Sequence, residues 1–242
     1  MKTSISDNEL YPSICELAAK TDEYFSKFKS LPRYTDILEH VTYEEGLEYI
    51  QQFFYNDEII KNIDKFKIND RYGSPRTYDF KYGTFSPTTL RYIKILNDLM
   101  QLKLNDTTIV EIGCGYGGQY TTLRQMIKPK TYIFIDLPPV LSLIKKYISE
   151  LELDDIDLIF VEPDKLIEIN ADLIISNYAF SECNTAIQDA YMPIVNNSKH
   201  GYMIYNNMEG YTSDEFIAKT KHKVHINKEI PQTHPRNVLL TW

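Results

Sequence analysis

Short apolar runs in the second half of the chain have the composition of buried β-strands. Five of them are TIVEI (108–112), TYIFID (131–136), IDLIFV (156–161), ADLIIS (171–176) and GYMIYN (201–206). Helical patterns separate most of them, in QYTTLRQMI, PVLSLIKKYISEL and TAIQDAYMPIV. Runs that are apolar on both faces and alternate with helices predict a mostly parallel sheet with helices on both sides. The final segments, HKVHI and NVLLTW, predict two further strands, as a hairpin at the sheet edge.

The first hundred residues show helical patterns instead. The motifs S-x-x-E at 13–16 and T-x-x-E at 42–45 are typical of capping boxes that open helices. Ser86 followed by Pro87 predicts another helix start. The pattern changes near residue 105. We therefore predict an N-terminal helical region with an acceptor lid over 1–104 and a cofactor-binding domain over 105–242.

Composition and charge limit the function classes. The net charge of -8 and the pI of about 5.2 argue against a general nucleic-acid binder, which needs a basic surface. The three cysteines are far apart and odd in number, which suggests neither a disulfide framework nor a metal-ligand pair and favours the cytoplasm. The first residues lack the apolar core of a signal peptide, and no apolar run suits a membrane span. We expect neither nucleic acid nor membrane as partner; the oligomeric state stays open, with a homo-oligomer among the alternatives.

The stretch IVEIGCGYGGQ (109–119) carries the most specific local signal of chemistry. Gly113, Gly115 and Gly118 fit G-x-G-x-x-G between a predicted strand and a predicted helix, which is the context of a nucleotide-binding loop. Asp136 ends the next strand, 18 residues after Gly118, where a carboxylate can accept hydrogen bonds from ribose hydroxyls. The combination predicts a site for a nucleoside-containing cofactor.

Three features favour S-adenosylmethionine (SAM) over a nicotinamide dinucleotide. Glu111 lies two residues before Gly113; its carboxylate would repel a pyrophosphate and attract the ammonium and sulfonium of SAM. The fingerprint lies in mid-chain, whereas dinucleotide enzymes more often begin with it. Polar Ser176 and Asn177 end the fourth strand, at the switch-point crevice where ligands bind in open α/β sheets.

The phrase VEIGCGYGG resembles motif I of class I SAM-dependent methyltransferases. More narrowly, the sugar O-methyltransferase family of bacterial polysaccharide gene clusters is similar in SPTTLRYIKIL, VEIGCGYGGQ, YIFIDLPPVLSLIKKYI, DLIISNYAFSE, GYMIYN and the ending NVLLTW. The first 65 residues resemble nothing known to us. The resemblance implies a Rossmann-like, seven-stranded, mostly parallel α/β sheet with SAM over its carboxyl edge. It also implies a sugar hydroxyl as acceptor, on a nucleotide-activated sugar for capsule or other surface polysaccharide synthesis. Cys114 departs from the family's usual glycine but is small enough to keep the turn.

Eight residues are predicted to contact the cofactor: Glu111, Gly113, Gly115, Tyr116, Asp136, Leu137, Asp164 and Asn177. We expect Glu111 and Asn177 at the methionine end and Asp136 at the ribose. Leu137 is expected to pack on the adenine and Asp164 to reach its amino group. The backbone at the two glycines lets the cofactor approach, with Tyr116 beside it.

A sugar hydroxyl is a weak nucleophile at neutral pH, so a general base would add roughly 10²–10⁴-fold in rate. Glu182 is the first candidate because it follows the fourth strand near the cofactor edge; the alternative is that it caps the next helix. His234 is a second candidate base, or a surface residue. Asn206 and Asn207 either bind sugar hydroxyls or merely turn the chain.

The segment 70–94 is expected to cover the acceptor. Residues 69–87 read as an irregular loop, and the segment carries Arg71, Arg76, Lys81 and Arg91 among several tyrosines. Arginine suits a diphosphate, although these side chains can equally pair with surplus carboxylates elsewhere. The aspartates of 154–157 read as a solvated turn, and we predict no metal.

Other function classes stay open on sequence grounds. A nicotinamide-dependent oxidoreductase would use the same glycine loop, but a convincing catalytic Tyr-x-x-x-Lys is missing from the sequence. A scaffold protein would keep the fold without turnover. Within the methyltransferases, a non-sugar hydroxyl on a small molecule or lipid is the second choice of acceptor.

Overall fold

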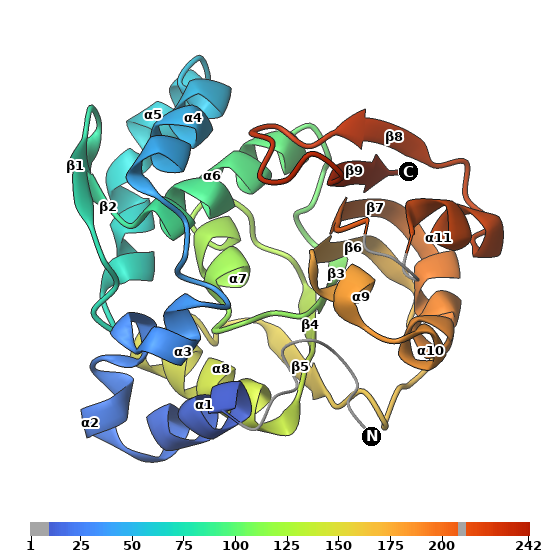
Figure 1. The fold of residues 1–242 in the computed structure, drawn as a ribbon, viewed down its shortest axis with the longest axis horizontal. Coiled ribbons are helices and arrows are strands. Elements are labelled where there is room, and N and C mark those ends of the chain that lie inside the picture. Colours follow the sequence, from blue (N-terminus) through green and yellow to red (C-terminus); the bar gives the residue numbers. More distant parts are fainter. Residues whose placement is uncertain (1–9, 208–211) are drawn as a thin grey trace.

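A seven-stranded sheet organises the chain in a computed structural model that describes residues 10–207 and 212–242 (Figure 1). The strands lie in the order β5 (Asp157–Val161), β4 (Thr131–Ile135), β3 (Thr108–Ile112), β6 (Ala171–Asn177), β7 (Ser198–Tyr205), β9 (Val238–Thr241) and β8 (His225–Lys228). The first five are parallel, and β9 runs antiparallel to both of its neighbours. The predicted mostly parallel sheet and its edge hairpin are confirmed.

The order of the strands fixes where a ligand can bind. The first five positions run 3-2-1-4-5 in the sequence order of the sheet strands, as in doubly wound folds, and the direction in which strands are added to the sheet reverses between β3 and β6. The carboxyl ends of these two neighbours therefore border the switch-point crevice. In place of a sixth parallel strand, the sheet continues with the antiparallel β9 and β8.

Helices precede the sheet and connect its strands. Those before β3 are α1 (Leu10–Lys20), α2 (Asp22–Phe25), α3 (Pro32–Thr35), α4 (Tyr43–Phe53), α5 (Asp57–Lys61), α6 (Pro87–Leu99) and the 3₁₀ helices η1 (Phe28–Ser30) and η2 (Ile63–Asp70). The later ones are α7 (Gly118–Leu123), α8 (Pro138–Glu150), α9 (Ala179–Glu182), α10 (Thr185–Asn196) and α11 (Ser213–Lys219). In the described part of the chain, none has the length and apolar character of a transmembrane helix.

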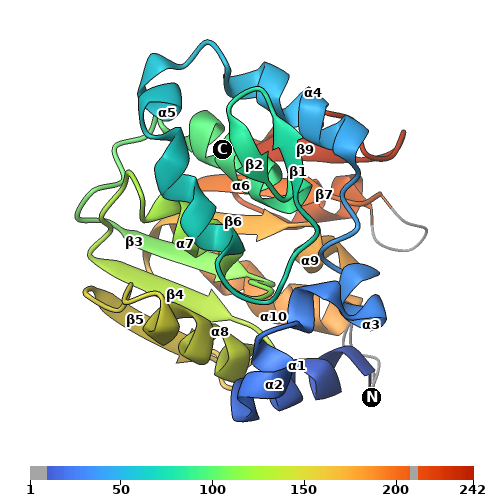
Figure 2. The ribbon, with the colours of Figure 1, turned by 90° about the vertical axis from the view of Figure 1, so that its left-hand side faces the viewer.

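Alternating strand residues serve two separate cores. Ile109 and Leu173 face a large core with α6, α7, α8 and the N-terminal helices, whereas Val110 and Ile174 face a second core with α10 and α11. Figure 2 shows α1 and α2 beside α8 and α4 above α6. Both faces of the central strands are thus buried, which explains why their sequences are apolar without interruption.

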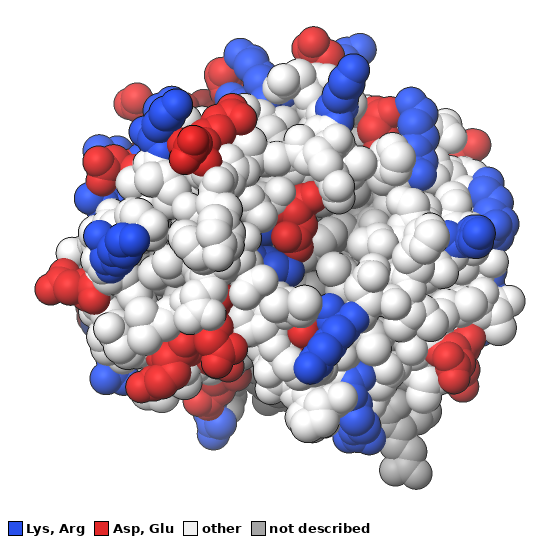
Figure 3. All heavy atoms as spheres, turned by 90° about the horizontal axis from the view of Figure 1, so that it is seen from above, with Lys and Arg blue, Asp and Glu red and all other residues white. Residues whose placement is uncertain are grey.

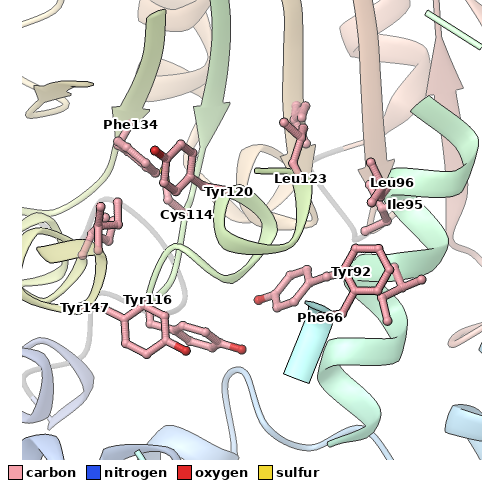
Figure 4. Packing of buried hydrophobic residues seen from close by; sticks show 14 of the residues in the cluster. Phe66, Tyr92, Ile95, Leu96, Cys114, Tyr116, Tyr120, Leu123, Phe134 and Tyr147 are labelled. Carbon is pink, nitrogen blue, oxygen red and sulfur yellow. The ribbon is translucent and has the colours of Figure 1, made fainter. Parts of the chain in front are cut away.

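The N-terminal helices share the large core with the sheet. The Lys29 ammonium is fully buried there, 2.6 Å from the carbonyl oxygen of Asn69 and 3.9 Å from the centroid of the Tyr116 ring. Tyr116 and Tyr147 meet edge to face at 5.1 Å (Figure 4). Burial lowers the pKa of Lys29 to about 8. This aromatic packing ties the region before residue 105 to α7 and α8.

Local start signals succeed at two helices and fail at one. Thr42 and Glu45 form the predicted capping box of α4, and the Ser86 side chain caps α6. The expected start at Ser13 is wrong, because α1 already begins at Leu10. The segment predicted as an irregular loop contains a small hairpin, β1 (Tyr78–Phe80) with β2 (Gly83–Phe85).

Candidate active site

The glycine-rich bend connects β3 to α7 and has a backbone that requires glycine. Gly113 has φ +74°, a conformation that other residues rarely adopt. A Cβ at this position would lie 1.9 Å from the Cβ of Ala179 in α9. The bend therefore brings bare backbone close to the carboxyl end of β6, and it leaves space beside it for a ligand.

A cavity of 490 Å³ opens at this end of the sheet. It collects residues that follow β3, β4, β6 and β7, together with parts of the N-terminal helices and of the connection between β8 and β9. Its polar lining comprises His40, Glu45, Tyr49, Arg91, Glu111, Asp136, Asn177, Tyr178, Glu182, Asn206, Asn207, Thr233, His234, Arg236 and Asn237.

Of the predicted cofactor residues, the structure brings five to this cavity. They are Glu111, Gly113, Gly115, Asp136 and Asn177. Both candidate bases, Glu182 and His234, line the same cavity. Parallel strands end at one edge of the sheet, so residues distant in sequence meet here.

Glu111 is a buried acid at the inner end of the cavity. It is 2% exposed, and the Tyr132 hydroxyl donates a hydrogen bond of 2.7 Å to its Oε2. Burial raises the pKa of Glu111 to about 8, with the negative charge of Asp136 adding to the rise. The ionised Glu111 expected from the sequence is therefore not the resting form: without a cation beside it, the carboxyl keeps its proton at neutral pH. A bound cation would favour the ionised form.

Asp136 follows β4 and holds the glycine bend. Its Oδ2 accepts hydrogen bonds from the backbone N–H of Cys114 at 2.6 Å and of Gly115 at 3.3 Å. Its Oδ1 accepts from the Leu137 N–H at 2.7 Å. Burial raises the pKa of Asp136 to about 6, although these hydrogen bonds lower it. The sequence did not reveal this contact with the bend; two carboxylate oxygens keep further acceptor capacity for a ligand.

Asn177 and its neighbours form a sharp exit from β6. Tyr178 has φ +71°, and the Ser176 hydroxyl accepts a hydrogen bond from the Phe180 N–H at 3.0 Å. The Asn177 Oδ1 atom is buried and has no hydrogen-bond partner. Because an unsatisfied buried acceptor is costly, a donor on a bound ligand would remove this cost.

Glu182 and His234 approach the cavity from different elements. Glu182 ends α9, and the Asn206 side-chain amide donates a hydrogen bond of 3.0 Å to its Oε1. Burial raises the pKa of Glu182. His234 lies exposed in the connection between β8 and β9, where its Nδ1 accepts from the Arg236 N–H at 3.3 Å. The half-buried Glu182 carboxyl, held by the Asn206 amide, is the better positioned of the two candidate bases.

Three predicted cofactor residues do not line the main cavity. Tyr116 is fully buried on the other side of the bend, where its hydroxyl accepts a hydrogen bond of 3.0 Å from Asn69. This packing takes its ring away from the cofactor position that we predicted. Asp164 is exposed beyond β5. Leu137 lines a smaller cavity of 50 Å³, which shares Gly113 and Asp136 with the large one.

The expected acceptor lid has a different arrangement. Of the four basic residues predicted to act there, only Arg91 lines the cavity, from the buried face of α6. Arg71, Arg76 and Lys81 are exposed, and the hairpin β1–β2 lies at the outer edge of the molecule in Figure 1. The wall opposite the glycine bend includes Tyr11 and Leu38 instead. These N-terminal residues have no local motif that could have predicted this position.

The described residues contain no group of three or more His, Cys, Asp or Glu side chains arranged to hold a metal ion. In the acidic turn before β5, Asp155 forms ion pairs with Arg124 and Lys128. All three cysteines are buried and free.

The known proteins that resemble this chain are solved structures. No protein-family model matches the chain, and no curated protein matches it. Among solved structures, a SAM-dependent methyltransferase from Aquifex aeolicus is 15% identical, with a TM-score of 0.47, over 62% of this chain and 86% of that chain. An rRNA methylase from Streptococcus thermophilus is 17% identical, with a TM-score of 0.48, over 62% and 95% of the two chains.

A third similar structure is TrmK from M. capricolum in complex with S-adenosylhomocysteine. It is 18% identical, with a TM-score of 0.44, over 61% of this chain and 66% of that chain. These identities and TM-scores are too low to assign a cofactor or a substrate. Those assignments depend on the residues of the cavity.

Proposed function

We propose that this protein is a SAM-dependent O-methyltransferase that acts on a sugar hydroxyl. The observation that carries the proposal is the buried Glu111 carboxyl at the inner end of a cavity beside the glycine bend. A buried carboxyl that is protonated in the free protein ionises more easily when a cation lies beside it. A pyrophosphate is negatively charged and would make that ionisation less favourable. An ammonium group is therefore the better partner.

The other cavity residues fit the same cofactor. Asn177 has a free buried acceptor for a donor on the methionine part, and Asp136 has acceptor capacity for ribose hydroxyls. The smaller cavity at Leu137 adjoins Asp136, on the side where we propose that the adenine lies. SAM supplies an activated methyl group when it is bound.

The remaining part of the cavity suits a polar acceptor. Glu182, Asn206 and Asn207 line it together, so an acceptor hydroxyl can be oriented by the amides and can give its proton to the carboxylate. With SAM bound, the amides would orient the acceptor hydroxyl toward the methyl group that SAM supplies, and Glu182 would take the proton that the hydroxyl loses. Alignment of the two reactants supplies much of the remaining rate gain. The sugar, on a nucleotide carrier for surface polysaccharide synthesis, is proposed from the resemblance of residues 70–210.

SAM affinity is expected to rise with pH up to about 8, by at most about tenfold per pH unit. The free protein holds a proton on Glu111, whose pKa is about 8, and binding of an ammonium lowers that pKa. Binding therefore releases a proton, and the release becomes easier as the pH increases. Calorimetry at pH 6, 7 and 8 in buffers of different ionisation enthalpy measures both effects. Glu111→Gln should bind SAM more weakly with a flat pH profile; a wild-type profile that is already flat would contradict the role of Glu111.

Two experiments test the proposed function. Calorimetry with SAM, S-adenosylhomocysteine and NAD compares the cofactors, and a preference for NAD would favour the oxidoreductase. Mass spectrometry of nucleotide sugars, free sugars and small non-sugar alcohols incubated with protein and SAM identifies the acceptor by a gain of one methyl group. Binding of SAM without transfer to any of them would favour a scaffold. Total RNA is included in the same panel because the net charge of the protein predicts that nucleic acid is not its substrate.

Figure 3 shows the distribution of charged side chains on one face of the molecule. Acidic and basic side chains are interspersed there, and the described residues of this face form no continuous basic patch. Protein surfaces that bind nucleic acid are normally basic over a wide area.

A further inference from the structure

The positively charged Arg91 side chain forms no ion pair with a residue that the structure describes. It is 5% exposed and lines the cavity from α6. Its buried Nε has no hydrogen-bond partner, whereas its other nitrogens have a long hydrogen bond to the Leu38 carbonyl oxygen, at 3.4 Å from Nη2, and a side-chain hydrogen bond with Tyr92. Within 10–207 and 212–242, no carboxylate oxygen lies within 4.0 Å of its nitrogens. Glu39 acts on it only from farther away.

A buried guanidinium with free donors is expensive to maintain. Burying a charge costs several kcal/mol unless it is paired and hydrogen-bonded. The rings of Tyr92 and Tyr178, at 5.6 and 5.9 Å from the guanidinium carbon, hold it in place but offer weaker compensation than an anion. An anionic group of a ligand in the cavity would satisfy the free donors in a bidentate geometry.

The position of Arg91 favours the acceptor over the cofactor. Besides the large cavity, Arg91 lines a small neighbouring one with Tyr202 and Ile204 of β7 and with Pro231. These residues lie beyond β6 from Glu111 and the glycine bend, since β6 separates β3 from β7 in the sheet. Arg91 therefore borders the β7 side of the cavity, and β7 is the strand that Asn206 and Asn207 follow.

A second arginine lines the same cavity at its exposed rim. Arg236 has no ion pair with any residue that the structure describes, and its carbonyl oxygen accepts a hydrogen bond of 3.0 Å from the Asn207 amide. The carboxylates of the same region have other partners. Glu45 accepts from the Thr42 N–H in its capping box, and Glu182 accepts from Asn206.

We propose that the acceptor carries an anionic group, a carboxylate or a phosphate, which Arg91 binds in the cavity with Arg236 at its rim. This inference rests on the proposed function, because it places the cofactor in the other part of the cavity. It narrows the acceptors to charged sugars such as a uronic acid, a sugar phosphate or a nucleotide sugar. A neutral sugar would leave the donors of Arg91 unsatisfied.

Calorimetry on the protein loaded with S-adenosylhomocysteine tests the proposal. The probes are glucose 1-phosphate, glucuronic acid and the neutral control glucose. At least one charged sugar should bind tenfold or more tightly than glucose, and which one does so distinguishes phosphate from carboxylate. Equal affinity for all three sugars would overturn the proposal, whatever the behaviour of any variant.

Variants locate the effect. Arg91→Gln should remove the preference for the charged sugar, whereas Arg76→Gln, an exposed arginine from the same segment, should keep it. Arg236→Gln, whose exposed position makes misfolding no concern, should reduce the preference at least twofold. Arg91→Gln should bind S-adenosylhomocysteine within twofold of the wild type. A tenfold loss there would show that Arg91 binds the cofactor carboxylate, and would overturn the proposal. If the wild type itself fails to bind S-adenosylhomocysteine, the proposed function fails too.

Discussion

Glu182→Gln is expected to lower the rate of methyl transfer about 10²-fold while SAM affinity stays unchanged. Glutamine keeps the size of the side chain and its place beside Asn206, but it cannot take the proton of the acceptor hydroxyl. Single-turnover measurements with saturating SAM give the rate, and calorimetry gives the affinity. An unchanged rate would show that Glu182 is not the base.

The pH profile separates the base from a merely structural residue. Burial raises the pKa of Glu182 above its usual value of 4.5, and the carboxyl acts as a base only when it is ionised. The wild-type rate should therefore increase with pH through this raised value, and the increase should disappear in Glu182→Gln. His234→Gln is the matched comparison in the same cavity; if it loses the rate instead, His234 is the base.

Gly113→Ala is expected to destabilise the protein by about 2–5 kcal/mol and to abolish measurable SAM binding. The backbone at Gly113 has a positive φ, and the added Cβ would lie 1.9 Å from the Cβ of Ala179. The bend must move, and it carries the N–H groups that Asp136 accepts from. Denaturant unfolding measures the loss of stability, and calorimetry measures the loss of binding.

A double variant distinguishes the two causes. Adding Ala179→Gly removes the clashing methyl group and leaves the backbone strain, so it should restore part of the unfolding free energy. If Gly113→Ala is as stable as the wild type and binds SAM normally, the bend is less constrained than its geometry indicates.

The strands of the sheet were predictable because each is marked by its own short run of residues. Runs such as TIVEI and ADLIIS are apolar on both faces, and their β3 and β6 strands fall within one residue of the predicted limits. The edge hairpin follows from two short strands near the end of the sequence. The start of α1 was missed because Ser13 matches a capping pattern inside a helix that packing on α8 already holds.

The sequence predicted the positions of site residues that lie at the ends of strands. It did not predict the positions of side chains that are set by packing between distant segments. Glu111, Asp136 and Asn177 meet because parallel strands end together. Tyr116 lies in the same loop, but its ring packs into the aromatic core with Tyr147. The protonation of Glu111 was also beyond sequence reasoning, because it depends on how completely the neighbouring helices exclude water.

The cavity draws its walls from segments at opposite ends of the described chain, from Tyr11 to Asn237. The predicted cofactor-binding domain, 105–242, would lack the side formed by Leu38, Tyr49 and Arg91. A fragment limited to that domain would thus lack one wall of the cavity. Tight ligand binding therefore requires that the N-terminal region and the predicted cofactor-binding domain are packed together, so ligand affinity can be used to detect this packing.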